Sequence, residues 1–90
     1  IDIIVFTAVS PNKDGVNDTF HIGGIEDKPD NTLRVYNRWG NLVFEQESYN
    51  NQWEGTWDGN DLPDGTYYYI FDVLDQGETR VFKGYLEIYR

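Results

Sequence analysis

Short stretches in which apolar and polar residues alternate recur along this chain, and this pattern predicts β-strands rather than helices. The clearest example is residues 32–38, Thr-Leu-Arg-Val-Tyr-Asn-Arg, where Leu and Val lie on one face and Arg and Tyr on the other. A further strand is expected at residues 42–45, after Gly40-Asn41, a dipeptide that favours a hairpin turn. These two strands should therefore pair in antiparallel fashion.

The C-terminal third of the chain has the strongest strand pattern. Residues 65–73 are rich in tyrosine and β-branched residues, and residues 81–89 form a second long strand. A turn at residues 75–78 separates the two. We expect them to form a central hairpin, with a bend at Gly84 in the last strand.

Two shorter strands are expected near the N-terminus, at residues 3–9 and 19–22. No stretch of a dozen residues has convincing helical periodicity. Short strands separated by turns predict an all-β fold, an immunoglobulin-like antiparallel β-sandwich of about seven strands. The 90 residues have room for one domain, residues 1–90. Because the chain begins with a strand-like run and no Met, we interpret it as a fragment of a longer protein.

Composition narrows the classes of partner. The net charge is −9 and only 7 residues are Lys or Arg, which argues against nucleic acid and against an anionic membrane surface. The absence of Cys excludes disulfides and thiolate metal sites. Aromatic residues make up 17% of the chain, and such large rings can fill the core of a small domain.

Residues 10–20, Ser-Pro-Asn-Lys-Asp-Gly-Val-Asn-Asp-Thr-Phe, form the first candidate site. Asn12, Asp14, Asn17 and Asp18 offer the oxygen ligands that Ca²⁺ prefers, although the pattern is not that of an EF-hand loop. The alternative is a turn in which the Asn and Asp side chains bond the local backbone. We favour the self-bonded turn and leave calcium open as a possible cofactor.

The three tryptophans are the second set of candidates. Together with Tyr49, they could form an aromatic platform for sugar rings, but in small sandwiches such rings more often belong to the core or fix a loop. We assign this structural role to Trp39 and Trp57 and leave the role of Trp53 open.

Catalytic chemistry has little support in the sequence. His21 is the only histidine, and no Ser or Cys pattern accompanies it, which argues against a nucleophilic triad and a catalytic zinc. A 90-residue sandwich also has little room for the pocket that paired carboxylates would need. We therefore expect no catalytic residues.

Several motifs occur in order over nearly the whole chain. They are F-T and S-P-N-K-D-G-V-N-D-T-F within residues 6–20, V-Y-N-R-W-G-N-L-V-F at 35–44, W-E-G-T-W-D-G at 53–59, L-P-D-G-T-Y-Y-Y at 62–69 and K-G-Y-L-E-I-Y-R at 83–90. In order and spacing they resemble the gliding motility-associated C-terminal domain, the type B C-terminal sorting domain of the type IX secretion system. The chain departs from that family by an inserted Val9-Ser10 and by Lys13, where Gly is usual.

This resemblance implies a non-catalytic signal at the C-terminus of a large secreted protein of Bacteroidetes-type bacteria. The signal would direct its cargo through the periplasm and outer membrane to the cell surface or medium. Its partners would be the type IX outer-membrane translocon and a PorP/SprF-like outer-membrane protein. The isolated domain is expected to be a monomer that does not span a membrane. The residues that we expect to be recognised are Asn12, Asp14, Asn17, Asp18, Trp53 and Trp57.

Two other functions remain open from the sequence. The aromatic loop with Tyr49, Trp53 and Trp57 is compatible with a carbohydrate-binding module of a surface protein. A purely structural β-sandwich module is the other, because sandwiches host many functions.

Overall fold

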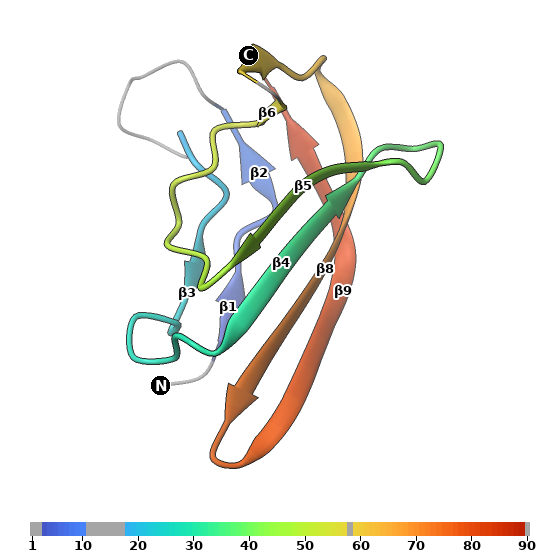
Figure 1. Cartoon of the computed structure of the whole chain (residues 1–90). Coiled ribbons are helices and arrows are strands. Elements are labelled where there is room, and N and C mark those ends of the chain that lie inside the picture. Colours follow the sequence, from blue (N-terminus) through green and yellow to red (C-terminus); the bar gives the residue numbers. More distant parts are fainter. Residues whose placement is uncertain (1–2, 11–17, 58, 90) are drawn as a thin grey trace.

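A five-stranded sheet is the largest element of the computed structural model, which describes residues 3–10, 18–57 and 59–89 (Figure 1). The order of the strands across the sheet is β2-β9-β8-β4-β5. Their bounds are Ala8–Val9 for β2, Asn31–Tyr36 for β4, Leu42–Glu47 for β5, Gly65–Asp75 for β8 and Glu78–Ile88 for β9.

The last two strands form the long hairpin that the sequence predicts. β8 pairs with β9 from Gly65↔Ile88 to Asp75↔Glu78, and β8 also pairs with β4 on its other side. The hairpin turn contains Gln76 and Gly77, both of which have positive φ angles. Positive φ at both central residues is what a two-residue type I′ turn requires, and this turn suits the twist of the strands.

The predicted pairing of β4 with β5 is also confirmed. The loop between them turns at Gly40, whose φ is +84°. The register shifts between Val35 and Tyr36, which pair with Phe44 and Leu42, and Val43 is the additional residue on β5. Val43 is buried, so this bulge adds an apolar side chain to the core.

The N-terminal segment differs from the single strand expected at residues 3–9. It contains two short strands in different sheets: β1, Ile4–Val5, pairs with β3, Ile22–Gly23, and β2 pairs with β9. The pairing of β2 with β9 is parallel, so the expectation of a purely antiparallel sandwich is wrong at this edge.

The described residues contain nine strands rather than about seven, because the N-terminal strand is split and a small ladder is present. This ladder joins β6, Thr56–Trp57, to β7, Asn60–Asp61. The all-β class is confirmed, and the arrangement is compatible with a β-sandwich. No helix in the described part of the chain is long and apolar enough to cross a membrane.

One face of the five-stranded sheet forms the core. β1, β3 and the segment that follows β5 cover this face (Figure 1). The sheet contributes alternate side chains, which are Leu33, Val35, Tyr67, Tyr69, Phe71, Val73, Leu86 and Ile88. The opposite face of the sheet carries the intervening side chains, which are half-buried or exposed.

Gly84 has a packing role in this core. It pairs with Tyr69 on β8, and a Cβ atom at Gly84 would lie 3.1 Å from both Cε2 and the hydroxyl oxygen of Tyr69. The missing side chain therefore provides the space in which the Tyr69 ring lies over β9.

Candidate functional site

Phe20, at the end of the Asn- and Asp-rich segment, is held in the core by Tyr49 and Trp53. The backbone N–H of Phe20 donates to the Trp53 carbonyl at 2.9 Å, and the Tyr49 hydroxyl donates to the Phe20 carbonyl at 2.5 Å. The Phe20 and Trp53 rings meet edge to face, with centroids 6.4 Å apart. Burial raises the pKa of Tyr49 well above its usual value, so its hydroxyl stays protonated and can donate.

Asn51 bonds the backbone of Ile22, two residues after Phe20. Its side-chain oxygen accepts from the Ile22 N–H at 2.8 Å, and its side-chain nitrogen donates to the Ile22 carbonyl at 3.2 Å. The amide thus bonds Ile22 as a neighbouring strand would. Asn51 has a φ of +63°, a conformation that Asn tolerates better than most residues. The two Asn51 bonds and the contacts of Phe20 fix the C-terminal end of the Asn- and Asp-rich segment to the core.

Most of the predicted calcium ligands cannot be placed. Asn12, Asp14 and Asn17 lie outside the described residues, and Asp18 is half-buried two positions before Phe20. Within the described ranges no group of three or more His, Asp or Glu side chains could hold a metal ion. Calcium binding by these four residues therefore stays a prediction.

The structure separates the three tryptophans by their burial. Trp53, whose role was open, is in the core with only 3% of its surface exposed, stacked on Phe44 at 5.0 Å between ring centroids. Its indole N–H donates to the Thr56 carbonyl at 2.8 Å. Trp39 and Trp57 are 72% and 54% exposed, so neither belongs to the core, and a role in fixing their loops stays a prediction.

These positions change the set of rings that a partner can reach. Tyr49 and Trp53 are both buried, so they cannot form a sugar platform with Trp57, and Trp53 cannot contact a partner directly. Trp57 remains accessible beside Leu42, where both line a hollow of about 350 Å³. Trp39 lies in the β4–β5 loop, and the Arg38 guanidinium is 4.6 Å from the centre of its ring.

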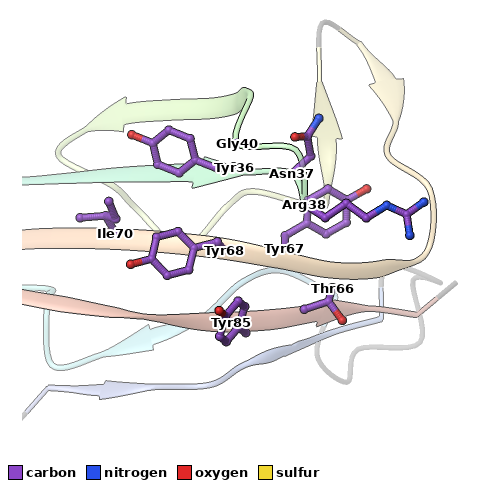
Figure 2. A pocket seen from close by; sticks show the side chains of 9 residues that line it. All are labelled: Tyr36, Asn37, Arg38, Gly40, Thr66, Tyr67, Tyr68, Ile70 and Tyr85. Carbon is purple, nitrogen blue, oxygen red and sulfur yellow. The ribbon is translucent and has the colours of Figure 1, made fainter.

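The uncovered face of the sheet carries a groove that the sequence analysis missed. Tyr36, Tyr68 and Tyr85 follow one another across β4, β8 and β9 (Figure 2). The ring centroids are 6.4 Å apart for Tyr36 and Tyr68, and 5.5 Å apart for Tyr68 and Tyr85. We call this hollow of about 630 Å³, to which Ile70 and Arg38 also contribute, the tyrosine groove.

A signal for this groove was present in the sequence. The run Tyr67-Tyr68-Tyr69 lies in a strand, and successive residues of a strand point to opposite faces. At least one of the three tyrosines therefore had to lie on the face away from the core. Tyr68 is that residue, and its cross-strand partners Tyr36 and Tyr85 extend the row.

Arg38 is the charged side chain among the described residues that line the tyrosine groove. The chain has a net charge of −9, yet no Asp or Glu lines the groove in the described part of the chain. The nearby Glu87 carboxylate accepts a hydrogen bond from the lining residue Thr66. Arg34, on the same face, bonds Glu45 at 2.7 Å and lies 3.6 Å from Asp72, so its charge is balanced. Arg38 lines the groove, and none of the described carboxylates forms an ion pair with it.

The loop that carries Arg38 is well defined. The Asn37 side-chain oxygen accepts from the backbone N–H groups of Trp39 and Asn41, both at 3.0 Å. The Asn37 N–H donates to the Asn41 carbonyl at 3.0 Å, and the Gly40 N–H donates to the Asn37 carbonyl at 2.9 Å. This network orients the backbone at Arg38 before any ligand is present.

Comparisons with known proteins agree with this all-β arrangement. The crystal structure of CopC from Methylosinus trichosporium OB3b is similar, with a TM-score of 0.56 and 19% sequence identity over 98% of this chain and 89% of the CopC chain. At that identity the likeness shows the fold alone. A search of curated proteins gave no match.

The family comparison is more specific. Residues 3–88 match the CHU_C type IX secretion signal domain, and this range includes every motif on which the resemblance rests, apart from the last two residues of the last motif. The match covers nearly the whole chain, including the segment held by Tyr49 and Trp53. The chain therefore belongs to the type IX secretion signal domain family, whose members mark proteins for export to the cell surface or medium.

Proposed function

We propose that this domain is the non-catalytic C-terminal signal of a larger cargo protein, and that it directs this cargo through the outer membrane after export to the periplasm. The observation that carries the proposal is the family match over residues 3–88. In this proposal the cargo has whatever activity the whole protein has, and this domain is the signal for its export.

Specific partners belong to the same proposal. We infer that the domain binds a PorP/SprF-like outer-membrane protein as a folded monomer before it reaches the translocon. The described features that support recognition of a folded shape are the exposed Trp39 and Trp57, the tyrosine groove and the edge strands β2 and β5. An edge strand could also pair with a strand of the partner.

A non-catalytic role is consistent with the surroundings of the only histidine. The His21 ring lies against the Phe6 ring, with centroids 5.4 Å apart. The backbone carbonyl of His21 accepts from the Phe6 N–H at 3.0 Å. Both contacts belong to the β1–β3 layer, which supports a structural role for this residue.

A reporter fusion tests the proposal. Residues 1–90 are fused to the C-terminus of a periplasm-targeted fluorescent protein in a bacterium with a type IX system, together with a PorP/SprF-like partner. We expect the reporter on the cell surface or in the medium, and in the periplasm when the translocon is deleted. Retention in the periplasm with an intact system and a matched partner would contradict the proposal.

A further inference from the structure

We propose that the tyrosine groove is where the secretion machinery binds this domain, and that the machinery contributes an extended peptide segment with a carboxylate that contacts Arg38. This inference rests on the proposed function, because it names the surface of the signal domain that the secretion machinery recognises. The groove crosses β4, β8 and β9 on the face of the sheet opposite the core (Figure 2).

The exposure of the tyrosines supports docking. Tyr85 is 69% exposed and lies beside Tyr68, on the part of β9 that precedes its pairing with β2. Tyr36 and Tyr68 are half-buried, and the three adjacent rings together form one aromatic patch on the sheet surface. Tyrosines are also enriched among the residues that contribute most to binding at protein interfaces, since they combine a large apolar ring with a hydroxyl.

The geometry of the row favours an extended peptide over a sugar chain. The rings of Tyr36 and Tyr68 are tilted by 44° and those of Tyr68 and Tyr85 by 59°, so they do not form a flat platform for the face of a sugar. Their spacings of 5.5 and 6.4 Å are close to the roughly 6.6 Å between alternate side chains of an extended chain. Alternate apolar side chains of such a segment can therefore contact successive tyrosines.

Charge complementarity points to a carboxylate in the bound segment. Among the described residues no Asp or Glu lines the groove itself, and the nearby Glu87 carboxylate accepts a hydrogen bond from Thr66. Arg38, at the edge of the groove, has no ion pair with the described carboxylates. A planar guanidinium suits a carboxylate, which it can bind through two parallel hydrogen bonds. The bonds of Asn37 hold the loop of Arg38 in place, so little ordering remains for the binding step.

The reporter fusion with a PorP/SprF-like partner also tests this surface. We expect Tyr68→Ala with Tyr85→Ala to reduce export at least about tenfold, because two central aromatic contacts are lost. Arg38→Glu should reduce export several-fold, and Arg38→Lys should reduce it less because the positive charge remains. Urea unfolding of each purified variant checks that the domain still folds. Tyr85→Ala alone is the second variant if the double variant does not fold, because this side chain is mostly exposed.

Tyr89→Ala is the matched control, since Tyr89 is 56% exposed, follows β9 directly and does not line the groove. Its export should equal that of the wild type. Wild-type export by a folded Tyr68→Ala, Tyr85→Ala variant would overturn the groove as the docking surface and leave the proposed function intact. Failure of the wild-type fusion to be exported would instead count against the proposed function. Binding of the purified domain to an acidic glycan that is lost in Tyr85→Ala would overturn the peptide as occupant.

Discussion

The hydroxyl of Tyr49 donates a hydrogen bond of 2.5 Å to the backbone carbonyl of Phe20, which lies 29 residues earlier in the chain. The same hydroxyl oxygen accepts from the Trp53 N–H at 3.3 Å. One phenol thus bonds the backbone of both segments that form the layer over the sheet. The Tyr49 hydroxyl therefore links the backbones of two segments that are distant in the sequence.

We expect Tyr49→Phe to lower the free energy of unfolding by about 1–3 kcal/mol, because the substitution leaves the buried Phe20 carbonyl and Trp53 N–H without their partner. Urea unfolding monitored by tryptophan fluorescence measures this change. Tyr85→Phe is the matched control, since Tyr85 is mostly exposed, and it should change the stability by less than about 0.5 kcal/mol. Equal stabilities for the two variants would contradict the role of the Tyr49 hydroxyl.

Stability should fall as the pH rises above about 10. Burial raises the pKa of Tyr49, and also that of Tyr69, above the value of a free tyrosine. Above the free value the unfolded chain has lost these protons while the folded chain keeps them, so unfolding becomes more favourable with each step in pH. Below that value both states are protonated, and the contribution is fully present.

The Tyr49→Phe variant isolates this effect. Its free energy of unfolding should decrease less between about pH 8 and about pH 11 than that of the wild type, since one of the two buried phenols is gone. Parallel curves for the two proteins over this range would show that Tyr49 does not cause the alkaline loss.

Gly84→Ala should destabilise the domain by about 1–3 kcal/mol. The new methyl group would lie 3.1 Å from the Tyr69 ring, which packs against Phe20 at 5.4 Å between centroids and has little room to move. Gly23→Ala is the control, because its Cβ would have only ordinary contacts at 3.7 Å or more and the residue is also in a strand. Thermal and urea unfolding should place the first variant below the wild type and the second close to it.

Calcium should leave the melting temperature unchanged if the Asn and Asp side chains of residues 12–18 bond their own backbone, which is the alternative that we favour. The measurement compares thermal unfolding in Ca²⁺ with that in a chelator. A bound ion at about 100 times its Kd would add roughly 2.7 kcal/mol, which is several degrees for a domain of this size. A shift of that size, lost when Asp14 and Asp18 are changed to Asn, would establish calcium instead.

Regular alternation made the two long hairpins predictable from the sequence. In β4 the alternation fixes both the strand and its buried face, the tyrosines and β-branched residues mark β8 as a strand, and Gly40 and Gly77 mark the turns. The division of residues 3–9 between two sheets was not predictable in the same way. A continuous apolar run carries no signal for the point at which the chain leaves one strand neighbour for another.

The burial of the aromatic rings was harder still to predict. Trp53 and Trp57 lie in the same polar, turn-rich segment, yet one is in the core and the other is in solvent. Local composition does not distinguish them, because burial here depends on contacts with Phe44 and Phe20, which come from distant parts of the chain. The tyrosine groove depends on register in the same way, since only the pairing of three strands brings Tyr36 and Tyr85 beside Tyr68.

The parallel pairing of β2 with β9 has a consequence for how the cell makes this domain. Ala8 and Val9 pair with Glu87 and Ile88, from near the opposite end of the chain. Until Glu87 and Ile88 have been translated, β2 has no strand with which to pair in this sheet. Such a contact between distant residues forms late. β2 can therefore join this sheet only after all of residues 8–88 have been synthesised.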